Sequence, residues 1–185
     1  MLLAAGCASL PPPPIAEQTF TGRFALTASG RGSDGTLRVE NQSGRFTLVI
    51  NAGTTTIDLA SPLGNTLARL QSSSAGARLQ VPEGGSLREI HDTNAEALAE
   101  RVLGFALPLA GLPWWIRGEP APDRAARVEH EAGAIARIEQ DGWTILVNER
   151  FDSPPSPRRL TLARAPSAQS PSMSLRVVLD APGAR

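Results

Sequence analysis

Apolar side chains alternate with polar or small ones in one short segment after another, and this pattern constrains the fold more than any other feature. A period of two is typical of a strand buried on one face. The segments recur at intervals of about ten residues, and comprise Phe24 and Leu26; Leu37 and Val39; Phe46, Leu48 and Ile50; Ile57 and Leu59; 67–71; 77–81; 127–131; 135–139; Trp143, Ile145 and Val147; Leu160 and Leu162; Leu175, Val177 and Leu179. Such spacing predicts one continuous antiparallel sheet with meander connections.

One stretch in the middle of the chain has helical spacing instead. Thr93 and Glu96 form a capping-box pattern, apolar residues then recur at helical intervals, and Gly104 ends the predicted helix. Pro113 predicts the first turn of a second short helix that ends at Gly118. We therefore expect an α+β fold that is mainly β, with the sheet curled over short helices.

Composition excludes several functional classes. The chain has 185 residues, with 18 basic and 18 acidic side chains, so no overall charge recruits nucleic acid. Every basic residue is arginine, which leaves no lysine for a Schiff base or a phosphate loop. One cysteine and two histidines exclude a disulfide framework and make a metal cage implausible. We predict no catalytic residue, no metal site and no cofactor.

The amino terminus resembles the lipobox of bacterial lipoproteins. Residues 1–7 form a short apolar run that ends at Cys7, the sole cysteine, which the resemblance implies is acylated. The alternative is a cysteine that stands there by chance. Four prolines follow within residues 8–18, which predicts an extended tether before a single domain at 19–181. No apolar stretch reaches the roughly 20 residues that span a bilayer, so we expect an anchored protein that does not cross the membrane.

The segment 61–66, Ser-Pro-Leu-Gly-Asn-Thr, predicts a tight turn between two strands. Pro62 and Gly64 flank Leu63 and leave it at the tip, where burial is hardest to arrange. An exposed leucine forgoes about 1.5–3 kcal/mol of burial, which contact with a bilayer or an apolar partner would recover. The alternative is that Leu63 folds back onto the sheet.

The order of these features resembles the LolB family, the outer-membrane receptors of bacterial lipoprotein sorting. The matching pieces, in order, are Cys7 with its tether, Gly22-Arg23-Phe24, the segment 61–66, Leu103-Gly104, Leu107-Pro108-Leu109, the segment 112–118 and Gln140-Asp141-Gly142-Trp143. The resemblance implies an open, unclosed antiparallel β-barrel whose short helices form a lid over an apolar cavity.

The same resemblance implies a function and its partners. The protein would accept acylated lipoproteins from a periplasmic carrier of the LolA type and insert them into the outer membrane, with Leu63 as the insertion residue. It would be a monomer, anchored through Cys7 to the inner leaflet of the outer membrane and facing the periplasm. Acyl transfer forms no covalent bond, so an absence of catalytic groups is expected.

Large apolar side chains from different elements are candidates for the cavity lining, although each could equally belong to a packed core. These candidates are Phe24, Leu48, Ile50, Trp115, Trp143 and Ile145. Two other functions stay open. A lipid-anchored adaptor that binds a protein partner would have a filled interior, whereas a periplasmic hydrolase would need His91 or His130 beside a serine and a carboxylate.

Overall fold

The computed structural model describes residues 17–31, 37–103, 107–166 and 171–183. Within them, eleven strands form one antiparallel sheet, with the order β6-β5-β4-β3-β2-β1-β11-β10-β9-β8-β7. The strands are β1 (Gln18–Arg31), β2 (Leu37–Asn51), β3 (Thr54–Ala60), β4 (Thr66–Ser73), β5 (Gly76–Glu83), β6 (Ser86–Asp92), β7 (Ala126–Glu131), β8 (Ala134–Gln140), β9 (Trp143–Asp152), β10 (Pro155–Arg164) and β11 (Ser172–Leu179).

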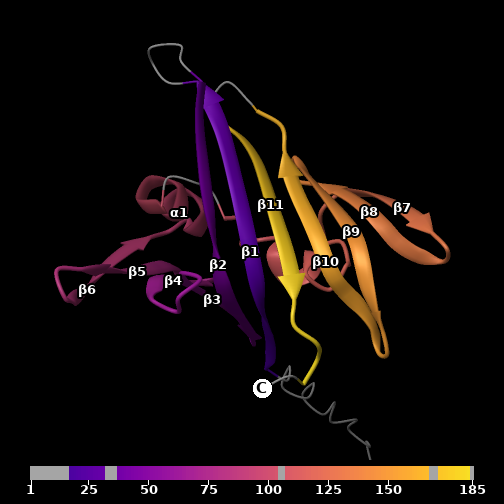
Figure 1. The fold of residues 1–185 in the computed structure, drawn as a ribbon, viewed down its shortest axis with the longest axis horizontal. Coiled ribbons are helices and arrows are strands. Elements are labelled where there is room, and N and C mark those ends of the chain that lie inside the picture. The colour runs from indigo at the N-terminus through magenta and orange to yellow at the C-terminus, as the bar shows by residue number, and fades with distance from the viewer. Residues whose placement is uncertain (1–16, 32–36, 104–106, 167–170, 184–185) are drawn as a thin grey trace, which may run out of the picture.

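The sheet consists of two meanders joined at its centre. Strands β1 to β6 run outward to one edge, β7 to β11 return from the other, and β1 pairs with β11 in the middle. Figure 1 shows the long central strands facing the viewer and the outer strands curling away on both sides. The edge strands β6 and β7 do not pair, so the sheet is not closed. The predicted fold, an open antiparallel barrel with short helices, is confirmed.

Both helices lie on the same side of the curled sheet (Figure 1). They are α1 (Ala95–Leu103) and α2 (Leu112–Trp115). They follow β6 and precede β7, so this part of the chain connects the two edges of the sheet. The capping box predicted at Thr93 is wrong in detail. Asn94 Oδ1 accepts hydrogen bonds from the backbone N–H groups of Glu96 (2.9 Å) and Ala97 (3.1 Å), as an N-cap residue does.

Three strands, β2, β6 and β10, differ from the sequence prediction. The two segments expected around Val39 and Phe46 form one strand, β2, because the polar residues between them pair with the equally long β1. Strand β6 was not predicted, since it is an edge strand whose exposed residues show no apolar alternation. Strand β10 starts at Pro155, earlier than the pattern at Leu160 and Leu162 indicated, because prolines and polar residues occupy its first positions.

The hydrophobic core lies between the concave face of the sheet and the helices. Phe24, Leu48, Leu70, Ile138 and Leu162 point inward from strands spread across both meanders. Leu98 of α1 and Leu112 of α2 complete the cluster from the other side. Because alternate residues on each strand point inward, the sheet contributes one apolar face and the helical segment covers it.

Candidate functional site

A short helical segment, residues 107–118, covers the centre of the concave face. Gly111 precedes α2 with no room for a side chain, because a Cβ there would lie 2.2 Å from the Trp115 ring. Pro113 stands in the first turn, as the sequence predicted. Gly118, at φ +74°, ends the segment by turning the chain. The segment presents Leu112, Trp115 and other buried apolar side chains to the sheet.

One buried glutamine fixes this segment to the sheet. Gln140, at the end of β8, is 3 % exposed. Its Oε1 accepts hydrogen bonds from Trp115 Nε1 and from the backbone N–H of Ala121, both at 2.8 Å. Its Nε2 donates to the carbonyl oxygens of Ala121 (2.9 Å) and Arg124 (3.2 Å). All four hydrogen-bonding positions of the amide are used, so Gln140 fastens both α2 and the chain after it.

Sequence reasoning included Gln140 in a family motif but assigned it no buried role, although a signal for one was present. Ile138 and Gln140 both occupy inward positions of a strand with period two, so a polar residue stands where the core face requires an apolar one. A polar side chain in such a position has to find buried partners.

An apolar cavity lies between residues 107–116 and the centre of the sheet. Its volume is about 30 Å³, which is room for about two water molecules and much too small for an acyl chain. Every lining residue is apolar, and they come from β1, β2, β3, β11 and the helical segment. The lining consists of Phe24, Leu26, Phe46, Ile57, Leu59, Leu107, Pro108, Leu112, Ile116, Leu175 and Val177.

Two glycines make room for the phenylalanine rings of this lining. Phe24 stands opposite Gly44, and Gly22 stands opposite Phe46, in the register of β1 and β2. A Cβ on Gly44 would lie 2.0 Å from the carbonyl oxygen of Ala60, so no larger residue fits without displacing the backbone. Each ring therefore lies beside a position without a side chain, which is a common pairing of aromatic residues with strand glycines.

The structure separates the six predicted lining residues. Phe24 lines the cavity. Leu48 and Ile145 are fully buried in the core, and Ile50 is partly buried against it. Trp115 of the helical segment and Trp143 of β9 do not line this cavity. They contact one another, with ring centroids 6.4 Å apart and ring planes at 48°.

A second, polar hollow of about 450 Å³ lies beside the tryptophans. Its walls include Glu96 of α1, Arg124, Asp141 and Arg164. Arg124 pairs with Asp141 and donates to the carbonyl oxygen of Ala110 at 2.9 Å. Burial raises the pKa of the Glu96 carboxyl, against the smaller effects of a hydrogen bond from the Ala110 backbone and of the nearby Arg164.

The loop between β3 and β4 holds Leu63 at its tip, 90 % exposed. Ser61 N–H donates to the carbonyl oxygen of Asn65 (2.8 Å), and Gly64 N–H donates to the carbonyl oxygen of Ser61 (2.9 Å). Ser61 Oγ also accepts from the Asn65 N–H at 3.1 Å, and Gly64 adopts φ +90°. These bonds define the loop and direct the leucine into solvent. The alternative, that Leu63 folds back onto the sheet, is not what the structure has.

The two histidines lie on opposite edges of the sheet. His91 is on β6, where its Nε2 is 2.8 Å from Glu89 Oε1, and His130 is on β7. Both are exposed, so the structure does not bring them into one cleft. Among the residues that the structure describes, no three histidine, cysteine, aspartate or glutamate side chains are grouped to hold a metal.

Comparison with known proteins agrees with this architecture. The family model described as "Outer membrane lipoprotein LolB" matches residues 17–181. An outer-membrane lipoprotein LolB of Thiobacillus denitrificans is 36 % identical over 95 % of this chain and 89 % of its own length. That of Cupriavidus pinatubonensis is 33 % identical over 97 % of the chain and 89 % of its own. The chain belongs to the LolB family.

LolB membership confirms the predicted location, since the family consists of outer-membrane lipoproteins, and the predicted general role in lipoprotein localisation. Neither described helix is long and apolar enough to cross a bilayer. The predicted acylation site Cys7 and most of the predicted tether at 8–18 lie outside the described residues. They stay predictions, as does the single domain at 19–181.

Proposed function

We propose that the protein accepts acylated lipoproteins from a LolA-type periplasmic carrier, shelters their acyl chains, and releases them into the inner leaflet of the outer membrane. Anchorage would be through acylated Cys7, with the domain facing the periplasm as a monomer. The transfer needs no bond chemistry, so the proposal assigns no catalytic group and no cofactor. The observation that carries it is the wholly apolar cavity between the sheet and residues 107–116.

The small volume of this cavity requires that the helical segment moves before an acyl chain binds. Moving it exposes Leu107, Leu112 and other side chains that are now buried. Each leucine exposed costs about 1.5–3 kcal/mol, and each methylene of cargo buried returns about 0.8 kcal/mol. About four to eight methylenes therefore offset the exposure of two leucines, and each further side chain of that size that is exposed needs about two to four more.

Displacement of α2 also gives the other predicted residues a route to the cargo. Trp115 moves with α2, and the face of Trp143 that it contacts then becomes free. Phe24 already lines the closed cavity. We keep Leu48, Ile50 and Ile145 as predicted lining of the opened state, reached only when the core next to the cavity rearranges.

Leu63 is proposed to insert into the bilayer at the release step. Its loop is held by its own hydrogen bonds, so the leucine is presented to a membrane without prior rearrangement. Burying its side chain in lipid gains about 1.5–3 kcal/mol. This gain would be available only where the loop touches apolar lipid, which couples release to arrival at a membrane.

The experiment follows a lipoprotein from purified carrier to a full-chain Cys7→Ser variant, and then into liposomes. Leu63→Glu is run in parallel, and Val39→Glu is the matched control because Val39 is also exposed, at 51 %, on another part of the surface. We expect all three proteins to accept cargo and only Leu63→Glu to lose membrane release.

A second candidate function, an anchored adaptor for a protein partner, is favoured by the nearly filled interior. It predicts no transfer of lipoprotein to the parent protein under any condition. That result would overturn the proposal, whereas transfer by the parent with release lost in both glutamate variants would overturn the role of Leu63 alone.

A further inference from the structure

Strands β4, β5 and β6 carry a row of apolar side chains on their outer face, away from the helices. Pro82 stands opposite Leu87 in the register of β5 and β6. In β4 and β5, Arg69 stands opposite Gln80 in the last pair of their ladder, and Leu67 and Pro82 each lie two residues beyond that pair, at the same end of the two strands. Leu67 is 38 % and Leu87 60 % exposed, and Pro82 is exposed as well. We call Leu67, Pro82 and Leu87 the outer apolar row.

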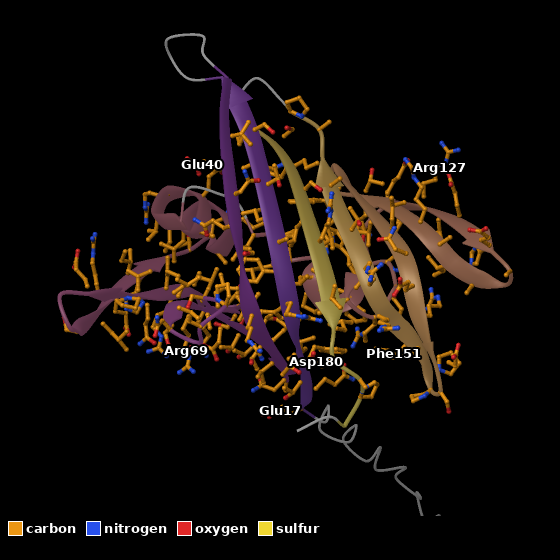
Figure 2. The ribbon with its side chains drawn as sticks, in the orientation of Figure 1. Glu17, Glu40, Arg69, Arg127, Phe151 and Asp180 are labelled. Carbon is orange, nitrogen blue, oxygen red and sulfur yellow. The ribbon has the colours of Figure 1, made fainter. Side chains whose placement is uncertain are left out.

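The next outward positions on the same strands are polar and paired with one another. Arg69 binds Asp58 of β3 through two hydrogen bonds. Gln80 Nε2 donates to Glu89 Oε2 at 2.7 Å. Figure 2 labels Arg69 at this surface. The outer apolar row is therefore a distinct strip at one end of the three strands, with an ordinary hydrated face directly beside it.

The outer apolar row is continuous with two other features. Leu67 is the second residue of β4, close after the loop that presents Leu63, so both leucines stand at the same end of β4. On the other side, Ala60 at the end of β3 pairs with Arg45 of β2, and Arg45 stands opposite Arg23 of β1. Both arginines are exposed. Two like charges directly opposite on neighbouring strands destabilise a sheet, so an anionic partner would relieve their repulsion.

We propose that the outer apolar row and the Arg23–Arg45 pair together form a surface that lies on a phospholipid membrane containing anionic lipids. Interfacial binding grows with the apolar area buried and with attraction to anionic headgroups, and this strip supplies both side by side. The leucines enter the headgroup boundary, and the arginines bind phosphate. Neighbouring strands are about 4.8 Å apart, so the strip from β1 to β6 is roughly 25 Å long when measured along the curled sheet.

This surface extends the membrane step of the proposed function but does not depend on cargo. It orients the domain, because contacts from more than one strand fix the sheet relative to the membrane, which a single leucine at a loop tip cannot do. The Leu63 loop is then held at the lipid surface during release.

The test measures vesicle binding by the full-chain Cys7→Ser protein without any lipoprotein. The vesicles are phosphatidylethanolamine with and without phosphatidylglycerol, at low and high salt. The variants are Leu67→Ser with Leu87→Ser, Leu87→Ser alone as a milder change on an edge strand, and Arg23→Gln with Arg45→Gln. Val39→Ser is the apolar control, and Arg127→Gln is the basic control on the far side of the molecule (Figure 2).

We expect the double leucine variant to bind both kinds of vesicle about tenfold more weakly than the parent. The affinity of Leu87→Ser should fall by less than this. The double arginine variant should lose about twentyfold, only on vesicles with phosphatidylglycerol and only at low salt. The controls should stay within about twofold. Parent-like binding by both double variants, or equal losses in the controls, would overturn the surface.

Two further readouts separate this inference from its alternatives. If the outer apolar row were instead an interface between two copies of the chain, sedimentation would show a dimer that the leucine variants dissociate, and the inference would be wrong. Transfer of lipoprotein from the carrier, measured without vesicles, should be the same in all variants. Failed transfer with the expected vesicle results would overturn the proposed function and leave this surface standing.

Discussion

Replacing Gln140 with leucine tests whether one amide fastens the helical segment to the sheet. The change keeps the side-chain volume and removes all four hydrogen bonds to Trp115, Ala121 and Arg124. Each such bond contributes about 1 kcal/mol net, so about 4 kcal/mol is lost. The apolar leucine recovers about 1 kcal/mol of this by its own burial. We expect the free energy of unfolding to fall by about 3 kcal/mol.

Thermal unfolding followed by near-ultraviolet circular dichroism measures this effect. A domain of this size loses about 2–4 °C in Tm for each kcal/mol, so Gln140→Leu should lower Tm by roughly 6–12 °C. Gln71→Leu is the matched control. Gln71 accepts one exposed hydrogen bond from Arg78 at 2.9 Å, and its loss should change the stability by about 0.5 kcal/mol or less.

The same variant should bind acyl chains faster if the helical segment moves to admit them. Its closed state is weakened, whereas the apolar lining from the sheet is untouched. A fluorescent fatty acid should therefore associate with Gln140→Leu faster than with the parent or with Gln71→Leu. A Tm equal to that of the control, or a lower Tm with an unchanged association rate, would refute the reasoning that Gln140 holds the segment closed.

Three further predictions use other parts of the structure. Gly44→Ala should destabilise the fold by about 3 kcal/mol in urea unfolding, because its Cβ would meet the backbone of Ala60. Leu63→Glu should change the free energy of unfolding by less than about 0.5 kcal/mol, since the side chain is already exposed. Burial raises the pKa of Glu96, so this group contributes stability below its unfolded pKa and loses it as pH rises through the folded value. Glu96→Gln should therefore stabilise the protein at neutral pH, and the difference should shrink in unfolding measured near pH 4.

The strand order could be predicted because the chain alternates in short segments with tight turns between them. Asp141-Gly142 is the clearest case, since both residues have positive φ, as the predicted hairpin turn requires. The prediction failed at β6 and within β2, where strands exist through backbone pairing with a neighbour and not through a buried face. A period-two pattern cannot reveal such segments.

The candidate site, too, could be predicted from the sequence only in part. The exposure of Leu63 followed from its local sequence, because Pro62 and Gly64 limit the loop to a few conformations. The cavity lining could not be predicted from the sequence. Large apolar side chains in a strand point inward whether they line a cavity or pack in the core. Phe24 and Ile145 stand in the same alternating sequence pattern. Phe24 lines the cavity and Ile145 is packed in the core, because residues 107–116 lie over Phe24.

The order of elements restricts how the site can open. The connection from the end of β6 to the start of β7, which includes α1 and the helical segment, joins the two edges of the described sheet, so it crosses the mouth of the curled sheet and is tied at both sides. Helix α1 packs on β4, β5 and β6, and none of its residues with a described side chain lines the cavity. The wall of the cavity is formed by residues 107–116, whose attachment to the other half of the sheet depends on Gln140. If the site opens to admit an acyl chain, we therefore expect α2 to leave β8 while α1 stays on β4, β5 and β6, which would widen the cavity toward Trp143 and the polar hollow.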